Sequence, residues 1–174
     1  EFTIRQSLVA RNRQVGLSIQ GSTAEMDGVI VRDTASQEVG KPFGRGISVE
    51  YCAGTNAPSE LTANFSIVSG NREVGVSVIG STAWLENIVV RQTVVEEDTD
   101  GAGDGIAVSG FPETPAHTDL TSVISEDNAQ AGLLLFAAGA SLESSVLRRN
   151  AFSVALADGA DVEIGAGNLL YDNE

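Results

Sequence analysis

The sequence has little of several residue types, and each shortage excludes a class of protein or site. It contains one Cys and one His among 174 residues. This excludes an internal disulfide framework, a cysteine-based metal cluster and any site that needs two imidazoles. No apolar run approaches the roughly 18 residues of a membrane-spanning helix, and no charged-then-apolar signal peptide opens the chain. Only 10 Lys and Arg stand against 24 Asp and Glu, giving a net charge of −14. That balance argues against nucleic acid or an anionic membrane as the main partner.

What the sequence does contain is an internal repeat. Residues 15–34 (VGLSIQGSTAEMDGVIVRDT) recur as residues 74–93 (VGVSVIGSTAWLENIVVRQT), so Gly16 corresponds to Gly75. A third copy occupies residues 132–150 (GLLLFAAGASLESSVLRRN). Self-similarity of this kind is typical of solenoid proteins, in which each repeat is one supersecondary unit.

Each copy contains a shorter unit that predicts two strands. A small residue begins the unit, and apolar residues follow it at the first and third positions, which predicts a strand with one buried face. The unit closes at an Asn or Thr corner, and an apolar residue stands four positions before each corner. We expect both apolar sets to face the core. The first set is Leu17, Ile19, Ile47, Val49, Val76, Val78, Ile106, Val108, Leu133 and Leu135, and the second is Ile30, Ile67, Val89, Ile124 and Val146.

Units this short, with no helical pattern, cannot bury a face alone and must stack on one another. Each strand then pairs in register with its copy in the next unit, about 4.8 Å away. We expect the corner Asn residues to form a hydrogen-bonded ladder. Plain turn chemistry is the alternative, because Asn tolerates left-handed backbone. The corner column is Asn12, Thr34, Asn71, Thr93, Asn128, Asn150 and Asn173.

The pattern GISV followed by A-x-L-E-N-x-V-V-R-x-T/N resembles the repeat of the pectate-lyase-like superfamily over essentially the whole chain. The resemblance implies an all-β fold, a right-handed single-stranded parallel β-helix of about seven turns. It says little about activity, because that superfamily holds lyases, hydrolases, epimerases and non-catalytic surface proteins. A looser resemblance to multi-repeat secreted proteins of bacteria implies a secreted or cell-surface location. We expect residues 1–174 to form one domain, a fragment of a longer β-helix.

Two insertion points, each used twice, provide candidate binding loops. The loops are residues 35–45, 94–104, 50–60 and 109–119. Equivalent loops lie two turns apart, so each pair should form a ridge, and the sheet between the ridges should be a shallow groove. We expect Arg45, Glu50 and Tyr51 to bind a ligand there. The alternative is that a solenoid merely tolerates insertions at these points.

The acidic loop that ends at Asp104 is the candidate metal site. Asp98, Asp100 and Asp104 alternate along a Gly-rich turn, and carboxylate and carbonyl oxygens are the ligands that calcium prefers. The loop has Ser109 where a calcium loop of the EF-hand kind would place its bidentate Glu. The alternative is a solvated acidic loop. Ca2+ is the one cofactor that these residues suggest.

Trp84 is a further ligand-binding candidate. It occupies the repeat position held by Glu25 and Ser141 in other copies, where the side chain should lean outward. An exposed Trp could stack on a sugar ring. Packing of the indole across the corner is the alternative.

The sequence favours binding over catalysis. The catalytic signatures of the superfamily are absent, and His117 stands in a Pro-flanked loop without the Asp motifs and the Arg-x-Lys that accompany the His of the superfamily's hydrolases. We expect a non-catalytic domain that displays loops to a polysaccharide or to another cell-surface protein. The alternative is a polysaccharide lyase or glycoside hydrolase that uses the acidic loop beside the groove. Because end turns leave strand edges unpaired, we also expect weak end-to-end self-association.

Overall fold

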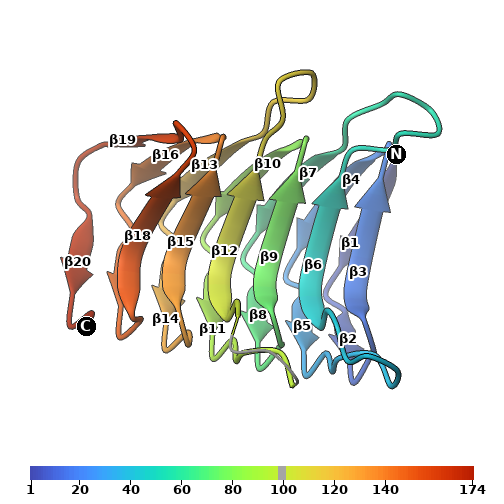
Figure 1. The fold of residues 1–174 in the computed structure, drawn as a ribbon, viewed down its shortest axis with the longest axis horizontal. Helices are drawn as coiled ribbons and strands as arrows, with labels where there is room; N and C mark the ends of the chain where they lie inside the picture. Colours follow the sequence, from blue (N-terminus) through green and yellow to red (C-terminus); the bar gives the residue numbers. More distant parts are fainter. Residues whose placement is uncertain (98–100) are drawn as a thin grey trace.

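The computed structural model describes residues 1–97 and 101–174. These residues form twenty β-strands, β1 to β20, in three sheets (Figure 1). Strands that are neighbours in a sheet come from successive turns of the chain and pair in parallel, as β6 and β9 do. The described residues contain no helix, and therefore none that could cross a membrane.

The three sheets are named A, B and C here. Sheet A contains β1 (Phe2–Arg5), β4 (Thr23–Asp27), β7 (Glu60–Asn64), β10 (Thr82–Glu86), β13 (His117–Thr121), β16 (Gly139–Glu143) and β19 (Asp161–Ile164). Sheet B contains β2 (Leu8–Ala10), β5 (Ile30–Arg32), β8 (Ile67–Ser69), β11 (Val89–Arg91), β14 (Ile124–Glu126), β17 (Val146–Arg148) and β20 (Leu169–Tyr171). Sheet C contains β3 (Val15–Gln20), β6 (Arg45–Glu50), β9 (Val74–Ile79), β12 (Asp104–Ser109), β15 (Ala131–Phe136) and β18 (Phe152–Ala157).

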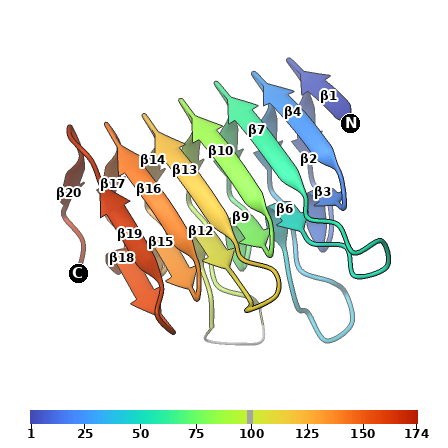
Figure 2. The same ribbon diagram turned by 90° about the horizontal axis from the view of Figure 1, so that it is seen from above.

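The chain visits sheets A, B and C in turn and returns to A one strand further along (Figures 1 and 2). This path is a right-handed parallel β-helix, which confirms the predicted fold class. The repeats therefore stack in register, as the sequence indicated. Val76, for example, pairs with Ile47 on one side and Ile106 on the other.

The core lies between the three sheets and contains the first predicted apolar set. Nine of those ten side chains are buried, and Leu17 in the first turn packs against them half-buried. Sheets A and B add further aliphatic side chains from the inner face of each turn, such as Leu85 and Val90. Sustained stacking of identical columns explains why strands of only three to six residues form a continuous core.

The second predicted apolar set is wrong by one residue. Ile30 is 39% exposed and Val89 is half-buried, whereas the next residues, Val31 and Val90, are fully buried. Each strand of sheet B has three residues, and only the middle one points inward. The reason is a positive-φ residue at the turn two positions before each strand, such as Asn87 with φ 54°. This turn changes which residues of the following strand point inward. Counting four positions back from the Asn or Thr corner does not reveal the change.

The predicted asparagine ladder is confirmed at the corner between sheets B and C. The backbone N–H and the side-chain Nδ2 of Asn128 both donate to Oδ1 of Asn150, each at 3.0 Å. Asn150 makes the same two bonds to Asn173, at 3.1 and 3.3 Å. Where Thr replaces Asn the ladder is interrupted. Among the described residues, the Thr93 hydroxyl and Nδ2 of Asn71 are buried without a hydrogen-bond partner.

The long loops flank sheet C at both ends of its strands (Figure 1). The connections between β6 and β7 (residues 51–59) and between β12 and β13 (residues 110–116) lie at the top in Figure 1. The connection between β5 and β6 (residues 33–44) and the described part of that between β11 and β12 lie at the bottom. In the lower pair, Lys41 Nζ contacts Glu97 Oε2 at 2.8 Å, so the two loops touch.

Candidate functional site

The upper pair of loops encloses a groove of about 350 Å3. Loop 51–59 supplies one wall and loop 110–116 the other. The floor is the short connection between β9 and β10, which has no insertion. We refer to this as the loop groove. It is lined by Tyr51, Asn56, Pro58, Gly80, Ser81, Thr82, Glu113, Thr114 and Pro115.

Hydrogen bonds hold both walls of the loop groove in place. Loop 51–59 is closed by Cys52, whose N–H donates to the carbonyl of Ala57 at 2.9 Å, and the Tyr51 hydroxyl hydrogen bonds to Asn56 Oδ1. Loop 110–116 is a tight turn in which Phe111 and Thr114 exchange two backbone bonds of 3.0 Å. Because the walls are already ordered, binding a ligand costs less conformational entropy.

Gly80 lets the walls approach the floor. Its φ is +54°, and a Cβ at this position would lie 2.9 Å from Thr114 Oγ1 and 3.1 Å from the Cβ of Tyr51. A larger residue would therefore push the two walls apart and strain the backbone. The narrow groove depends on a glycine that the sequence presents as only one of 19.

Arg45 and Glu50 meet on the outer face of sheet C, in a cluster completed by Glu73. Arg45 donates from Nε and Nη2 to the two oxygens of Glu73, each at 2.9 Å, and from Nη1 to Glu50 Oε1 at 3.0 Å. The Arg45 side chain is only 15% exposed. Burial alone would lower the pKa of Arg45, but the hydrogen bonds and charges of Glu73 and Glu50 raise it above the ordinary value.

The sequence predicted a shallow groove on the outer face of sheet C, and the Arg45–Glu50–Glu73 cluster covers that face at Ser48. Ser48 points out of sheet C but is fully buried, because it donates to Glu50 and lies beneath the Arg45–Glu50 pair. The guanidinium of Arg45 also lies 5.0 Å from the ring centre of Phe43, a cation–π contact. Arg45 and Glu50 are thus engaged with each other, and Tyr51, which follows Glu50 directly, reaches the loop groove.

Of the three candidate calcium ligands, two lie outside the described residues: Asp98 and Asp100. Asp104 begins β12 and is 3% exposed. Its Oδ1 accepts a 3.0 Å hydrogen bond from the backbone N–H of Ala131. Burial raises the pKa of Asp104 above the ordinary carboxyl value, the Ala131 bond lowers it, and the negative charge of Glu73 raises it further. No group of three potential metal ligands occurs within the described ranges.

Trp84 lies on sheet A, away from the other three predicted ligand-binding residues. It is on the outer face of β10 and 40% exposed. The structure therefore brings Arg45 and Glu50 together, places Tyr51 beside them, and leaves Trp84 on another face. The sequence predicted that loops 50–60 and 109–119 lie together, but it did not single out their groove residues Asn56, Glu113 and Thr114, because irregular loops carry no periodic pattern that shows which side chains face each other.

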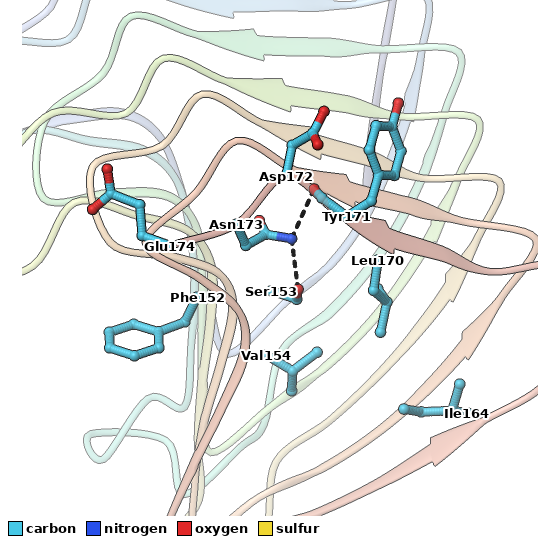
Figure 3. A pocket seen from close by; sticks show the side chains of 9 residues that line it. All are labelled: Phe152, Ser153, Val154, Ile164, Leu170, Tyr171, Asp172, Asn173 and Glu174. Carbon is cyan, nitrogen blue, oxygen red and sulfur yellow. Dashed lines mark hydrogen bonds between the residues drawn. The ribbon is translucent and has the colours of Figure 1, made fainter.

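A larger cavity, of about 580 Å3, lies at the last turn of the helix (Figure 3). Its apolar walls include Val154, Ile164 and Leu170, which occupy the core columns of sheets C, A and B. Asn173 crosses it and donates to the Ser153 hydroxyl at 2.7 Å and to the Tyr171 carbonyl at 2.9 Å. The cavity is continuous with the core and is not built from the loops.

Comparisons with known proteins agree with this architecture. No protein-family model matches the sequence, and no curated protein matches it with significance. Among solved structures, pectate lyase Pel9A superposes with a TM-score of 0.65 at 11% identity, over 95% of this chain and 48% of that chain. The A-module of Azotobacter vinelandii mannuronan C-5 epimerase AlgE6 superposes with a TM-score of 0.53 at 14% identity, over 99% of this chain and 58% of that chain.

These similarities define the fold class of the protein as a parallel β-helix. The chain spans about half the length of each of the two solved structures. At such low identity the likeness shows the fold alone.

Proposed function

We propose that this chain is a non-catalytic β-helix domain of a secreted or cell-surface protein, and that it binds a polysaccharide in the loop groove. The observation that carries the proposal is the groove itself. An aromatic side chain, Tyr51, lines it together with the amide of Asn56, the carboxylate of Glu113 and hydroxyl groups. Sugars are recognised by this combination of an aromatic face and a few placed polar groups.

The fold supports a carbohydrate ligand. Two solved structures with this fold are named for pectate and for mannuronan, which are polysaccharides of uronate units, so the carbohydrate class supports the proposal although the charge of those chains does not. A net charge of −14 disfavours a polyanionic chain, so a neutral polysaccharide is the better ligand for this protein.

The charged residues near sheet C support a binding role without catalysis. Arg45 makes three hydrogen bonds to two carboxylates, and Asp104 is buried against the Ala131 N–H. Each is occupied by a contact that orders the fold. A general acid or base must instead be within hydrogen-bond reach of the substrate.

Affinity gel electrophoresis with galactomannan, xyloglucan and polygalacturonate tests this function. We expect a neutral polysaccharide to retard the protein, and Tyr51→Ala to weaken that binding by about tenfold or more. Phe111→Ala is the matched control, because Phe111 is exposed on the opposite wall's loop but does not line the groove.

The same polysaccharides are then incubated with the protein, with and without calcium, and assayed for new reducing ends and unsaturated products. We expect neither. Depolymerisation that survives purification of the protein would overturn the non-catalytic assignment. If Tyr51→Ala bound the polysaccharide as tightly as the parent protein, the loop groove would not be the binding site.

A further inference from the structure

A second polar and aromatic surface lies on the outer face of sheet A, on β7, β10 and β13, the strands that lead away from the loop groove. Its centre is Trp84 on β10, which is 40% exposed. In register, Trp84 is flanked by Thr62 of β7 and by Asp119 of β13. We call Trp84 and its neighbours Thr62, Asn64, Glu86, Asp119 and Thr121 the Trp84 face.

The carboxylate of Asp119, beside Trp84 in the sheet, is fixed by hydrogen bonds. Asp119 accepts bonds from Ser141 Oγ and, at 3.1 Å, from the ring of His117. Although partial burial raises the pKa of Asp119, bonds from Ser141, His117 and Trp84 bring it below its ordinary value. Asp119 therefore stays ionised and places a negative charge beside Trp84, its register partner on β10.

A depression of about 150 Å3 adjoins the indole. Its rim carries an amide from Asn64, a carboxylate from Glu86 and hydroxyls from Thr62 and Thr121. Asn64 is fixed by a 3.1 Å bond from Asn87 Nδ2 to its Oδ1. Donors and acceptors thus surround one edge of an exposed aromatic ring, an arrangement that matches the hydroxyl groups and the apolar face of a pyranose.

The charge around this surface selects the kind of sugar. Among the described outward positions of sheet A, Arg5 is the one Arg or Lys. The carboxylates at those positions are Glu25, Asp27, Glu60, Glu86, Asp119, Glu143, Asp161 and Glu163. Like charges at this density repel a uronate-containing chain.

From these observations we infer that the Trp84 face is a binding site for a neutral hexose chain, separate from the loop groove. The sugar ring stacks on the indole, and its hydroxyl groups bond to Glu86 and Asn64. The flat outer surface of sheet A suits an extended, ribbon-like β-1,4-linked chain that crosses several strands. This site does not rest on the loop groove, because the two share none of their lining residues.

Trp84 is the only tryptophan of the chain, so its fluorescence reports on this site directly. The experiment is a titration of the full chain with cellohexaose and with mannohexaose, followed by Trp emission and by calorimetry, with hexagalacturonate as the charged probe. We expect a saturable change in emission with at least one neutral hexasaccharide and none with hexagalacturonate. Calorimetry should give the same dissociation constant.

Variants separate the two sites. In the Tyr51→Ala background, in which the loop groove is impaired, Trp84→Ala and Glu86→Ala should each weaken the calorimetric binding of the neutral hexasaccharide at least tenfold. Phe65→Ala, which removes a more exposed aromatic at the end of the neighbouring strand, should not. Tyr51→Ala should leave the change in Trp emission intact even if the loop groove fails as a binding site.

Two outcomes overturn the inference. One is calorimetric binding of a neutral hexasaccharide that leaves Trp emission unchanged and survives Trp84→Ala. The other is the absence of any binding of cellohexaose and mannohexaose to the folded chain. Trp84→Phe keeps an aromatic ring and should retain part of the affinity. This variant shows whether the loss of binding in Trp84→Ala comes from the missing ring or from loss of the fold.

Discussion

Val89 and Val90 are adjacent in β11 but face opposite sides of sheet B. Val90 is fully buried and Val89 is half-buried on the outer face. Val90→Asp places an unpaired carboxylate in the core, which costs several kcal/mol, on the order of a domain's whole stability. We expect Val90→Asp to unfold the protein by circular dichroism, whereas Val89→Asp folds with a modest loss in urea. Equal loss in both variants would contradict the inward assignment of Val90.

The interruption of the asparagine ladder at Thr93 can be repaired. In Thr93→Asn, the new Oδ1 can accept from Asn71 Nδ2, and the new Nδ2 can donate to Asn128 Oδ1, as Asn128 and Asn150 already do. Satisfying a buried donor is worth about 1 kcal/mol or more. The melting temperature should rise by roughly 2–4 °C for a chain of this size.

The matched control is Thr93→Val, which removes the unpartnered hydroxyl but adds no ladder bond. We expect the melting temperature measured by calorimetry to be higher for Thr93→Asn than for Thr93→Val. The reverse order would mean that the Asn side chain is too wide for the space beside Gly75. That space is narrow, since a Cβ built on Gly75 would lie only 3.1 Å from Thr93 Oγ1.

Asp104 makes stability depend on pH. Because its folded-state pKa is raised, the folded chain binds a proton that the unfolded chain does not, in the window between the unfolded and folded pKa values. Stability therefore falls as pH rises through that window and stays lower above it. Asp104→Asn keeps an acceptor for Ala131 and removes the buried charge. We expect this variant to melt higher than the parent at pH 7.5, by a margin that shrinks on acidification in buffered melting scans.

Each of the upper loops is an insertion on a turn that also exists without one. Gly80 and Ser81 alone connect β9 to β10, whereas residues 110–116 connect β12 to β13. Deleting residues 111–115 leaves Gly110 and Ala116 as an equivalent short connection. We expect the shortened protein to keep its β-sheet spectrum and melt within a few degrees of the parent.

The same deletion removes the groove wall formed by Glu113, Thr114 and Pro115. Retardation of the protein by a neutral polysaccharide in affinity electrophoresis should then fall to the level of Tyr51→Ala, while Trp84 emission still responds to cellohexaose or mannohexaose. A shortened protein that failed to fold would show that the loop is part of the core structure and not an added element.

For the whole molecule, self-repulsion is the main electrostatic term. The chain has a net charge of −14, and ion pairs on the surface, such as Arg13–Glu38 at 3.6 Å, contribute little. Salt screens repulsion between like charges more than about 10 Å apart at 0.1 M. We expect the melting temperature to be higher in 0.5 M than in 20 mM sodium chloride. A fall with salt, measured by differential scanning calorimetry, would show that attractive pairs dominate.

The stacking of the repeats is encoded in the order of the residues. Columns such as Ile47, Val76 and Ile106 recur at fixed places, and in-register stacking is the one arrangement that buries all of them together. The corner Asn residues and the four insertions follow from the same repeat. Fold class, strand positions, ladder and loop positions were therefore predictable from the residues and from their resemblance to known β-helices.

Only the tertiary structure shows which side chains lie on the same face of the β-helix. The inward residue of each sheet B strand depends on the positive-φ turn before it, and periodicity over three residues is too short to reveal that turn. The pairing of Arg45 with Glu73 joins two turns of the chain, as does the approach of Tyr51 to Thr114. Trp84 is separated from them because the chain bends between sheets C and A. Such contacts depend on the cross-section of the coil, a property of the stacked turns together that no single repeat encodes.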